Sequence, residues 1–228
     1  MKIFLDTAGI DEIRTAARWG VLDGVTTNPS LFAKVGGSYD DVLKQICEIT
    51  PGPVSAEVVA DDVEGMLREG RHFAKLAPNI FVKVPMSEDG LEAMARFAEE
   101  GIKTNCTLIF SANQGLLAAK AGVSLLSPFV GRLDDINQDG VEVVRELVAM
   151  VETYDLGAEV LAASIRSPRH MTEAALAGAH IATVPLKVLT QMIHHPLTDK
   201  GILQFRTDWE AAQAGHPGAK AVGKSSHA

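Results

Sequence analysis

The chain has 228 residues, of which 46% are apolar, and its 29 acidic and 21 basic side chains give a formal net charge of −8. This length fits one α/β barrel, which runs to roughly 250 residues as a single domain, and the apolar fraction is enough for a sizeable core. The acidic balance argues against a nucleic-acid-binding protein, which would need clustered Lys and Arg. It is compatible with a phosphorylated substrate, because a few well-placed cations suffice for one phosphate.

The cysteines and the N-terminus are typical of a protein of a reducing compartment. Cys47 and Cys106 belong to no C-x-x-C pair, so the sequence lacks the zinc and dithiol redox motifs. Asp6 interrupts the first apolar run at once, which favours a strand over a secretory signal. No apolar stretch approaches the ~20 residues of a transmembrane helix. We therefore expect a soluble, cytoplasmic protein that binds neither membranes nor nucleic acid.

Short apolar runs alternate along the chain with longer segments of helical periodicity. Several of the runs are continuously apolar, as parallel strands buried on both faces are. The predicted strands are Lys2–Asp6, Gly24–Thr27, Val54–Val59, Ile80–Pro85, Ile102–Thr107, Val123–Val130, Ala158–Ala163 and His180–Pro185.

Start and stop signals mark the helices between these strands. Asp61, followed by Glu64 three residues later, predicts one N-terminus, and Ser87 and the pair Ser167-Pro168 predict two others. The glycines expected to end helices are Gly20, Gly101, Gly122 and Gly178. Eight strand–helix units share the chain at about 28 residues each, close to the ~30 of a βαβ unit. This repetition predicts an α/β fold, a closed (β/α)₈ TIM barrel, and no open sheet.

A further helical segment follows the last strand, from about residue 197 to residue 214. Its apolar residues Leu197, Ile202, Phe205 and Trp209 need another surface, because the barrel is already complete. Residues 215–228 are rich in Gly, Ala and Ser and are predicted to be mobile. The sequence thus predicts one barrel domain over residues 1–228 with an additional C-terminal helix.

Lys83 is the most informative candidate, because active sites of such barrels lie at the C-terminal ends of the strands. It interrupts the apolar strand Ile80–Pro85. A lysine there can be a side chain that reaches out of a buried strand to water. It can also be a nucleophile, because burial disfavours the charged form of an amine and a neutral amine attacks ketones. The strand alone leaves both interpretations open.

Two carboxylates and two arginines lie near other strand ends. Asp6 and Glu57 can serve in acid–base chemistry, or as a helix cap and a surface ion pair. Arg132 and Arg166, with Ser164 after the seventh strand, can hold a phosphate in the usual phosphate region of these barrels. They can equally be ordinary surface arginines.

Six ordered segments together resemble the transaldolase family, in particular its short subfamily, which includes fructose-6-phosphate aldolase. The segments are Phe4-Leu5-Asp6-Thr7-Ala8, Thr26-Thr27-Asn28-Pro29-Ser30-Leu31, Val82-Lys83-Val84-Pro85, Asn105-Cys106-Thr107-Leu108-Ile109-Phe110, Ser127-Pro128-Phe129-Val130-Gly131-Arg132 and Ala163-Ser164-Ile165-Arg166. The resemblance covers residues 1 to about 210.

The resemblance implies a mechanism without a metal or cofactor, in which Lys83 forms an imine with a ketose phosphate. Asp6 would take the proton of the C4 hydroxyl as the C3–C4 bond breaks. Glu57 would act through a water positioned by Thr107. The other implied site residues are Asn28, Asn105, Ser127 and Phe129 around the three-carbon unit and Arg132, Ser164 and Arg166 at the phosphate.

The resemblance also implies the reaction and the assembly. A dihydroxyacetone unit would pass from sedoheptulose 7-phosphate or fructose 6-phosphate to glyceraldehyde 3-phosphate or erythrose 4-phosphate, as in the pentose phosphate pathway. Short members of the family form pentamers or decamers through the C-terminal helix.

Two alternatives remain. In a fructose-6-phosphate aldolase we expect Gln at the position of Glu57 and Tyr at that of Phe129, so both positions here favour a transaldolase. A non-catalytic sugar-phosphate-binding barrel would be expected to lack the amine or the acids, and this chain keeps them.

Overall fold

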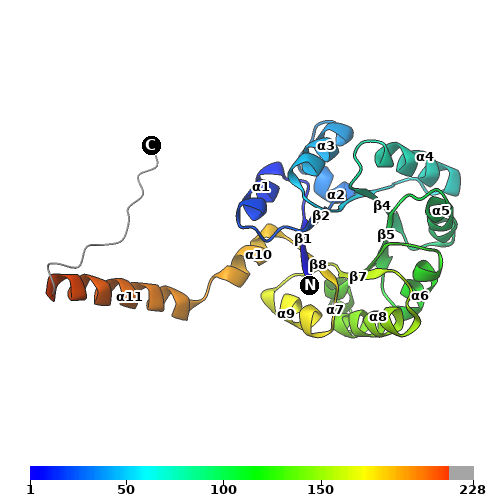
Figure 1. The fold of residues 1–228 in the computed structure, drawn as a ribbon. Helices are drawn as coiled ribbons and strands as arrows, with labels where there is room; N and C mark the ends of the chain where they lie inside the picture. The colour runs from blue at the N-terminus through cyan, green and yellow to red at the C-terminus, as the bar shows by residue number, and fades with distance from the viewer. Residues whose placement is uncertain (216–228) are drawn as a thin grey trace. The chain divides into compact units, whose positions relative to one another are not determined.

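The computed structural model describes residues 1–215, and the chain divides into two compact units, residues 1–189 and 190–228. In the first unit, parallel strands pair in sequence order and β8 pairs with β1, which closes the barrel (Figure 1). The strands are β1 (Lys2–Asp6), β2 (Gly24–Thr26), β3 (Val54–Glu57), β4 (Ile80–Pro85), β5 (Thr104–Ile109), β6 (Leu125–Pro128), β7 (Glu159–Ala162) and β8 (Ile181–Val184). The predicted (β/α)₈ barrel is therefore confirmed.

Helices surround this barrel on the outside of the sheet (Figure 1). They are α1 (Ile10–Arg18), α3 (Tyr39–Ile49), α4 (Val63–Ala74), α5 (Glu88–Glu99), α6 (Ala112–Lys120), α8 (Gly140–Tyr154), α9 (Pro168–Leu176) and α10 (Leu186–Ile193). Two short helices, α2 (Pro29–Phe32) and α7 (Val130–Asp134), occupy the connections after β2 and β6.

The predicted strands all exist; β1 and β4 have the predicted bounds, and the other six begin or end at different residues. β5 begins at Thr104 and continues to Ile109, and β6 ends at Pro128 because Val130 already begins α7. The N-cap of α4 is Asp62, so the prediction of Asp61 was wrong by one residue. The Asp62 carboxylate accepts a hydrogen bond from the Gly65 amide at 2.9 Å, which is the capping contact itself.

Apolar side chains fill much of the inside of the barrel. A cluster separate from the main core contains Phe4, Leu125, Leu161, Ala163 and Ile181. Phe4 fits because Gly24 stands beside it on β2: a side chain at Gly24 would come within 2.6 Å of the Phe4 ring. Since alternate strand residues face the same way, the next inward residue of each strand lies one layer closer to the C-terminal mouth. The polar residues of β1 and β6, Asp6 and Ser127, occupy that layer.

The main core lies between the sheet and the helices, and helix ends fix the helices against it. Ser87 and Ser167 cap α5 and α9 by accepting amide hydrogen bonds, as the sequence predicts. The glycines predicted to end helices, Gly20, Gly101, Gly122 and Gly178, all have positive φ. The ends of these helices are thus set by capping serines and by glycines that can be read from the sequence.

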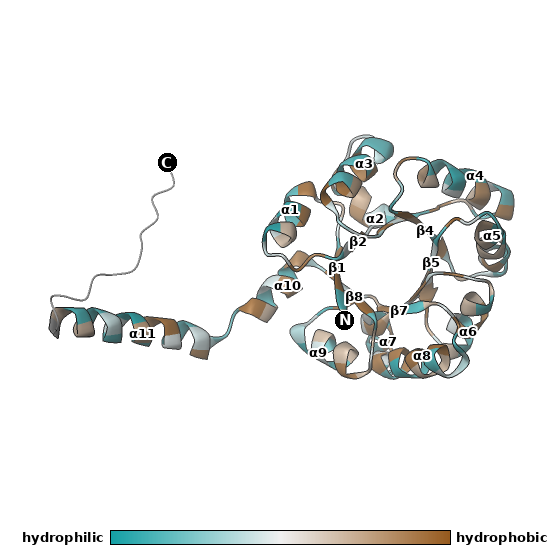
Figure 2. Cartoon of the chain, viewed as in Figure 1, coloured by the Kyte–Doolittle hydropathy of each residue, from teal (hydrophilic) through white to brown (hydrophobic). Residues whose placement is uncertain are grey.

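The second unit contains α11 (Pro196–Gly215), close to the predicted additional helix. Apolar and polar residues alternate along it (Figure 2), and its large apolar side chains are exposed: Leu197, Ile202, Leu203, Phe205 and Trp209. The predicted mobile tail falls on residues 216–228, outside the described part of the chain, while Gly215 still belongs to α11. Within residues 1–215, no helix is both long enough and apolar enough to cross a membrane.

Candidate active site

Lys83 points into the mouth of the barrel from β4 and is only 5% exposed. Its Nζ lies 2.9 Å from Glu57 Oε2 and donates to the main-chain oxygen of Thr27 at 3.1 Å. The register explains the ion pair, because Glu57 of β3 stands directly beside Lys83. Burying both charges costs free energy even when they are paired, so this ion pair adds little to the stability of the fold. The interpretation of Lys83 as a side chain that reaches out to water is wrong.

Asp6 ends β1 and lines the same mouth as Lys83. The Thr26 hydroxyl donates to Asp6 Oδ1 at 2.9 Å and lies 2.7 Å from the Thr183 hydroxyl of β8. The loss of water around the half-buried carboxylate raises the pKa of Asp6, while the charge of Lys83 and the Thr26 hydrogen bond partly oppose the rise. A carboxylate with a raised pKa is a better proton acceptor than a free aspartate.

A chain of hydrogen bonds connects β6, β5 and β3 beneath the mouth. Ser127 Oγ donates to Asn105 Oδ1 at 2.7 Å, and Asn105 Nδ2 donates to Ser55 Oγ at 3.0 Å. These contacts fix the orientation of the Asn105 amide. Thr107, two residues further along β5, has a fully buried hydroxyl without a hydrogen-bond partner among residues 1–215. Of the four buried side-chain groups without a partner in residues 1–215, Thr107 is the one that lines a cavity at the mouth, where its hydroxyl could bond to a water or a ligand atom.

Irregular backbone at two strand ends aims side chains toward this mouth. The pairing of β5 with β6 changes register between Cys106 and Ile109, and Leu108 within that interval has φ 59°. Ser164, just beyond β7, has φ 58°. Non-glycine residues in this region are uncommon and cluster at functional sites.

Two cavities open at the mouth and share Lys83. The inner one has about 130 Å³ and is lined by Asp6, Thr26, Asn28, Lys83, Ser127, Phe129, Arg132, Leu161, Ala163, Ser164 and Thr183. The outer one has about 380 Å³ and is lined by Asn28, Pro29, Ser30, Leu31, Glu57, Lys83, Thr107, Leu108, Phe129 and Arg132. The inner cavity is smaller than the roughly 300–1,000 Å³ of sites for larger ligands. Most of the sequence-predicted site residues therefore meet at one place.

The two arginines of the site have different positions. Arg132 lines both cavities, and its guanidinium carbon lies 4.9 Å from the centre of the Phe129 ring. Arg166 is not among the residues of the described chain that line either cavity. Its guanidinium forms a two-bond ion pair with Asp135, with Nη2 2.7 Å from Oδ2. Arg166 still lies near the site, because its Nε would come within 2.7 Å of a side chain added at Gly131.

Asn28 has a structural contact besides its place in both cavities. Its Oδ1 accepts the Leu31 amide at 2.9 Å and so caps α2. This capping fixes the side chain at the cavity wall.

Ser55 and Thr183 contact residues of the site but were not predicted from the sequence. A signal for them exists: Ser55 stands two residues before Glu57, and Thr183 is the polar residue of an apolar strand. Because strand residues two apart share a face, a polar residue in that pattern faces the barrel interior. That signal would have found Ser55 and Thr183.

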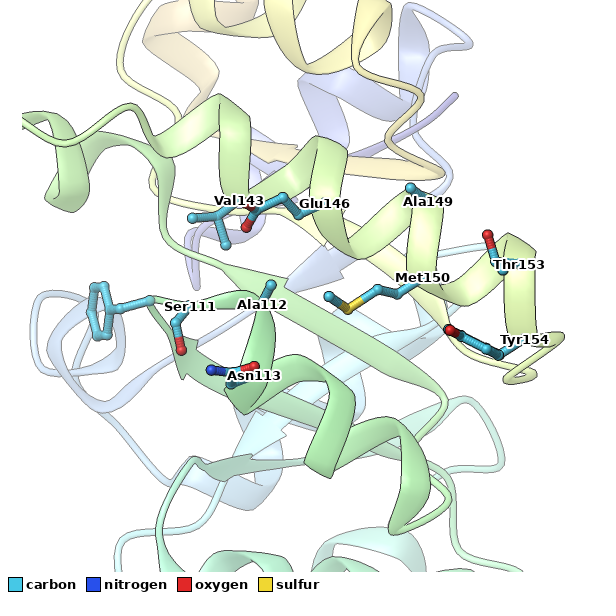
Figure 3. A pocket seen from close by; sticks show the side chains of 10 residues that line it. Ser111, Ala112, Asn113, Val143, Glu146, Ala149, Met150, Thr153 and Tyr154 are labelled. Carbon is cyan, nitrogen blue, oxygen red and sulfur yellow. The ribbon is translucent and has the colours of Figure 1, made fainter.

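A separate shallow pocket of about 610 Å³ lies between α6 and α8 on the outer layer (Figure 3). Ser111, Ala112 and Asn113 line it from the start of α6, and Met150 and Tyr154 from α8. None of the sequence-predicted site residues lines it. Within residues 1–215, no group of three or more His, Cys, Asp and Glu side chains is placed to hold a metal ion.

Fold and site together define a parallel barrel protein with a buried amine, two carboxylates and an arginine at its C-terminal mouth. The chain belongs to the Transaldolase/Fructose-6-phosphate aldolase family, whose sequence profile matches residues 3–219.

Relatives of known name agree with this membership. A protein of Thermoanaerobacter sp. (strain X514) named "Probable transaldolase" is 57% identical over 93% of this chain and 98% of its own length. Another "Probable transaldolase", from Herpetosiphon aurantiacus, is 59% identical over 92% of this chain and 95% of its own.

Among solved structures, thiamine phosphate pyrophosphorylase from Pyrococcus furiosus is similar with a TM-score of 0.58 at 15% identity, over 81% of this chain and 85% of that one. At this identity the likeness shows the barrel fold alone.

Proposed function

We propose that this chain is a transaldolase that moves a dihydroxyacetone unit from a ketose phosphate to an aldose phosphate through an imine on Lys83. The observation that carries the proposal is the placement of the Lys83 amine. It is buried at the mouth of the barrel, 2.9 Å from Glu57, and shares a small polar cavity with Asp6 and Arg132. The names of the relatives support the same reaction class.

Glu57 and Lys83 begin the reaction. The carboxylate accepts a proton from the ammonium group across the 2.9 Å contact, and the free amine attacks the C2 carbonyl of the ketose. The resulting carbinolamine loses water and leaves an iminium. Glu57 touches Nζ directly, so it can pass protons to that centre both by itself and through a bound water.

The buried hydroxyl of Thr107 supports a water at this place. It lines the outer cavity together with Glu57, and its hydrogen-bonding capacity is unused in the described residues. A water there would be held by Thr107 while Glu57 exchanges protons with it during carbinolamine formation and dehydration.

Asp6 then takes the proton of the C4 hydroxyl. As the C3–C4 bond breaks, its electron pair moves into the iminium to give an enamine, and the aldose phosphate leaves. The enamine attacks the aldehyde carbon of the acceptor, the new alkoxide recovers a proton from Asp6, and water releases the product ketose from Lys83. The iminium accepts the electron pair throughout, so the sequence of steps is balanced without an oxidant or reductant.

The two cavities together suit a ketose phosphate, because they meet at Lys83, Asn28 and Arg132. Asn28 and Ser127 line the inner cavity and would hold the three-carbon unit together with Asn105, whose amide is fixed by Ser127 and Ser55. Arg132 and Ser164, which also line the inner cavity, would donate to the phosphate with Arg166 beside them. Phosphorylated sugars such as sedoheptulose 7-phosphate, fructose 6-phosphate, glyceraldehyde 3-phosphate and erythrose 4-phosphate, those of the pentose phosphate pathway, fit this arrangement.

Acceptor dependence tests the transferase assignment. We expect the wild type to consume fructose 6-phosphate quickly only when erythrose 4-phosphate is present, because Phe129 offers the enamine no hydroxyl as a proton donor. Phe129→Tyr introduces a hydroxyl at the cavity wall, and Glu57→Gln removes the charge that exchanges protons with water. Both variants together should raise acceptor-free cleavage and lower transfer, each by at least about tenfold.

Phe110→Tyr is the matched control, because Phe110 packs against Phe129 with ring centres 5.7 Å apart but does not line either cavity. It should behave as the wild type. Rapid release of free dihydroxyacetone by the wild type, with no gain from erythrose 4-phosphate, would instead identify a fructose-6-phosphate aldolase.

We further propose that the chain forms a homo-oligomer, a pentamer or decamer, through α11. The exposed apolar residues of that helix support the proposal, because exposed patches of this kind mark interaction surfaces.

A further inference from the structure

Asp135 stands at the end of α7 and holds the Arg166 guanidinium by both terminal nitrogens. A two-bond contact between a guanidinium and a carboxylate fixes the plane of both groups, which a single bond does not. Both side chains are about half exposed, at 48% for Arg166 and 53% for Asp135. Exposed pairs of this kind add little to stability, so stability alone does not explain the pair.

The ion pair with Asp135 fixes the Arg166 side chain along α7. Its Cδ and Nε lie 2.9 and 2.7 Å from where a Cβ on Gly131 would stand, so the side chain runs along the first turn of α7. Gly131 is itself bonded to the strand end, because its amide donates to Ser164 O at 3.1 Å. Arg132 is the next residue, and Ser164 lines the inner cavity. Arg166 is therefore placed beside the other two groups of the proposed phosphate site.

Arg132 of α7 and Arg166 after β7 carry like charges that repel each other, and a free arginine has many rotamers. The Asp135 carboxylate reduces this repulsion and fixes the Arg166 rotamer. Its hydrogen bond with Arg166 lowers the pKa of Asp135 most strongly, and the charge of Arg132 lowers it further. The remaining N–H groups of the guanidinium stay available, because an arginine has more donors than the two that Asp135 takes. A side chain fixed before binding loses less entropy when a ligand arrives.

We propose that Asp135 is a positioning residue that holds Arg166 beside Arg132 for the substrate phosphate. This inference rests on the proposed function for its substrate, but phosphate binding can be measured without turnover. Asp135 does not contact the phosphate itself and acts through Arg166.

The first test is binding of inorganic phosphate to the full-length chain, measured by calorimetry. Asp135→Asn keeps the shape of the side chain and should weaken binding roughly two- to fivefold. Asp134→Asn is the matched control, because it removes the same charge from the same helix while its own contacts are with His170 and Gly140. It should leave phosphate binding unchanged. Equal effects in both variants, or tighter binding in Asp135→Asn, would show that Asp135 acts by its charge alone and would overturn the proposal.

A double-mutant cycle separates action through Arg166 from direct action. In an Arg166→Met background, Asp135→Asn should cause no further loss of phosphate binding. A further loss, or phosphate binding that is insensitive to Arg166→Met, contradicts the proposal whether or not the chain is a transaldolase.

Turnover supplies a second readout. Asp135→Asn should raise KM for fructose 6-phosphate by the same factor and leave kcat within about twofold. The trapping of unphosphorylated dihydroxyacetone on Lys83 by borohydride should be unchanged in Asp135→Asn, and Asp135→Glu should recover part of the KM effect. Absence of trapping in the wild type contradicts the proposed function, while the phosphate measurements still decide the role of Asp135.

Discussion

Burial of the ionised Asp6 carboxylate lowers the stability of the folded protein, and the proposed role of Asp6 as a proton acceptor accounts for this cost. The pKa of Asp6 is raised by burial, so the folded chain holds the Asp6 proton more tightly than the unfolded chain does. The ionised form therefore lowers stability. This cost is absent below the pKa of the unfolded state, near ~3.9, and grows as the pH rises to the folded-state value. Above the folded-state pKa the full cost applies, and there Asp6 is ionised, as a proton acceptor must be.

Asp6→Asn should therefore be more stable than the wild type and nearly inactive. The amide keeps the shape and the contact with Thr26, so Tm at pH 7 should rise by several degrees and the gain should shrink toward pH 4. Transfer should fall by roughly 10²–10⁴-fold. Asp61→Asn at an exposed position controls for the change of net charge and should change neither. A lower Tm for Asp6→Asn at pH 7, measured by calorimetry, would contradict the account.

The structure explains which site residues the sequence could predict. Lys83, Glu57 and Asp6 interrupt apolar strands at their ends, so their place in the chain already indicates the mouth of the barrel. The contact between Glu57 and Lys83 follows from strand register, which no local pattern gives. The pairing of Arg166 with Asp135 was unpredictable for the same reason, since it depends on the path of α7 beside β7.

At the scale of elements, the connections differ most from expectation. The short helices α2 and α7 were not predicted, because four or five residues show no helical period. Both start next to site residues: Asn28 caps α2, and Phe129 precedes α7. Strands and long helices were predictable from their period and caps, whereas the loops that carry the site depend on tertiary contacts.

Gly131 tests the packing of α7 on β7. A methyl group there would stand 2.4 Å from Ser164 O, too close for any side chain. Gly131→Ala should therefore move α7 away from β7. Overpacking of this kind costs about 1–3 kcal/mol, so Tm should fall by roughly 2–10 °C, and KM for fructose 6-phosphate should rise.

Gly201→Ala is the same substitution in α11, where, within residues 1–215, nothing outside the helix's own nearby backbone lies within 4 Å of the added carbon. It should leave Tm unchanged or raise it, because alanine favours the helix. If both variants had the same Tm, the close approach of α7 to β7 would not matter for stability.

At the scale of the whole molecule, α11 is the element that the barrel does not explain. We expect Phe205→Ser with Trp209→Ser to reduce the molar mass in light scattering from that of an oligomer toward that of a monomer of 24.3 kDa. Leu176→Ser on α9 removes an apolar side chain that is even more exposed, at 83%, and should leave the mass unchanged. A wild type that is already monomeric would rule out the oligomer.

The central claim is that Lys83 forms the covalent intermediate, and borohydride trapping tests it most directly. Wild-type protein incubated with fructose 6-phosphate and borohydride should gain the mass of one reduced three-carbon unit, and peptide mass spectrometry should place it on the peptide that contains Lys83. Lys83→Met should gain no such mass and should show no transfer. An adduct on another lysine, or full activity in Lys83→Met, would contradict the mechanism, and a wild type that neither traps the ketose nor turns it over would indicate a non-catalytic barrel.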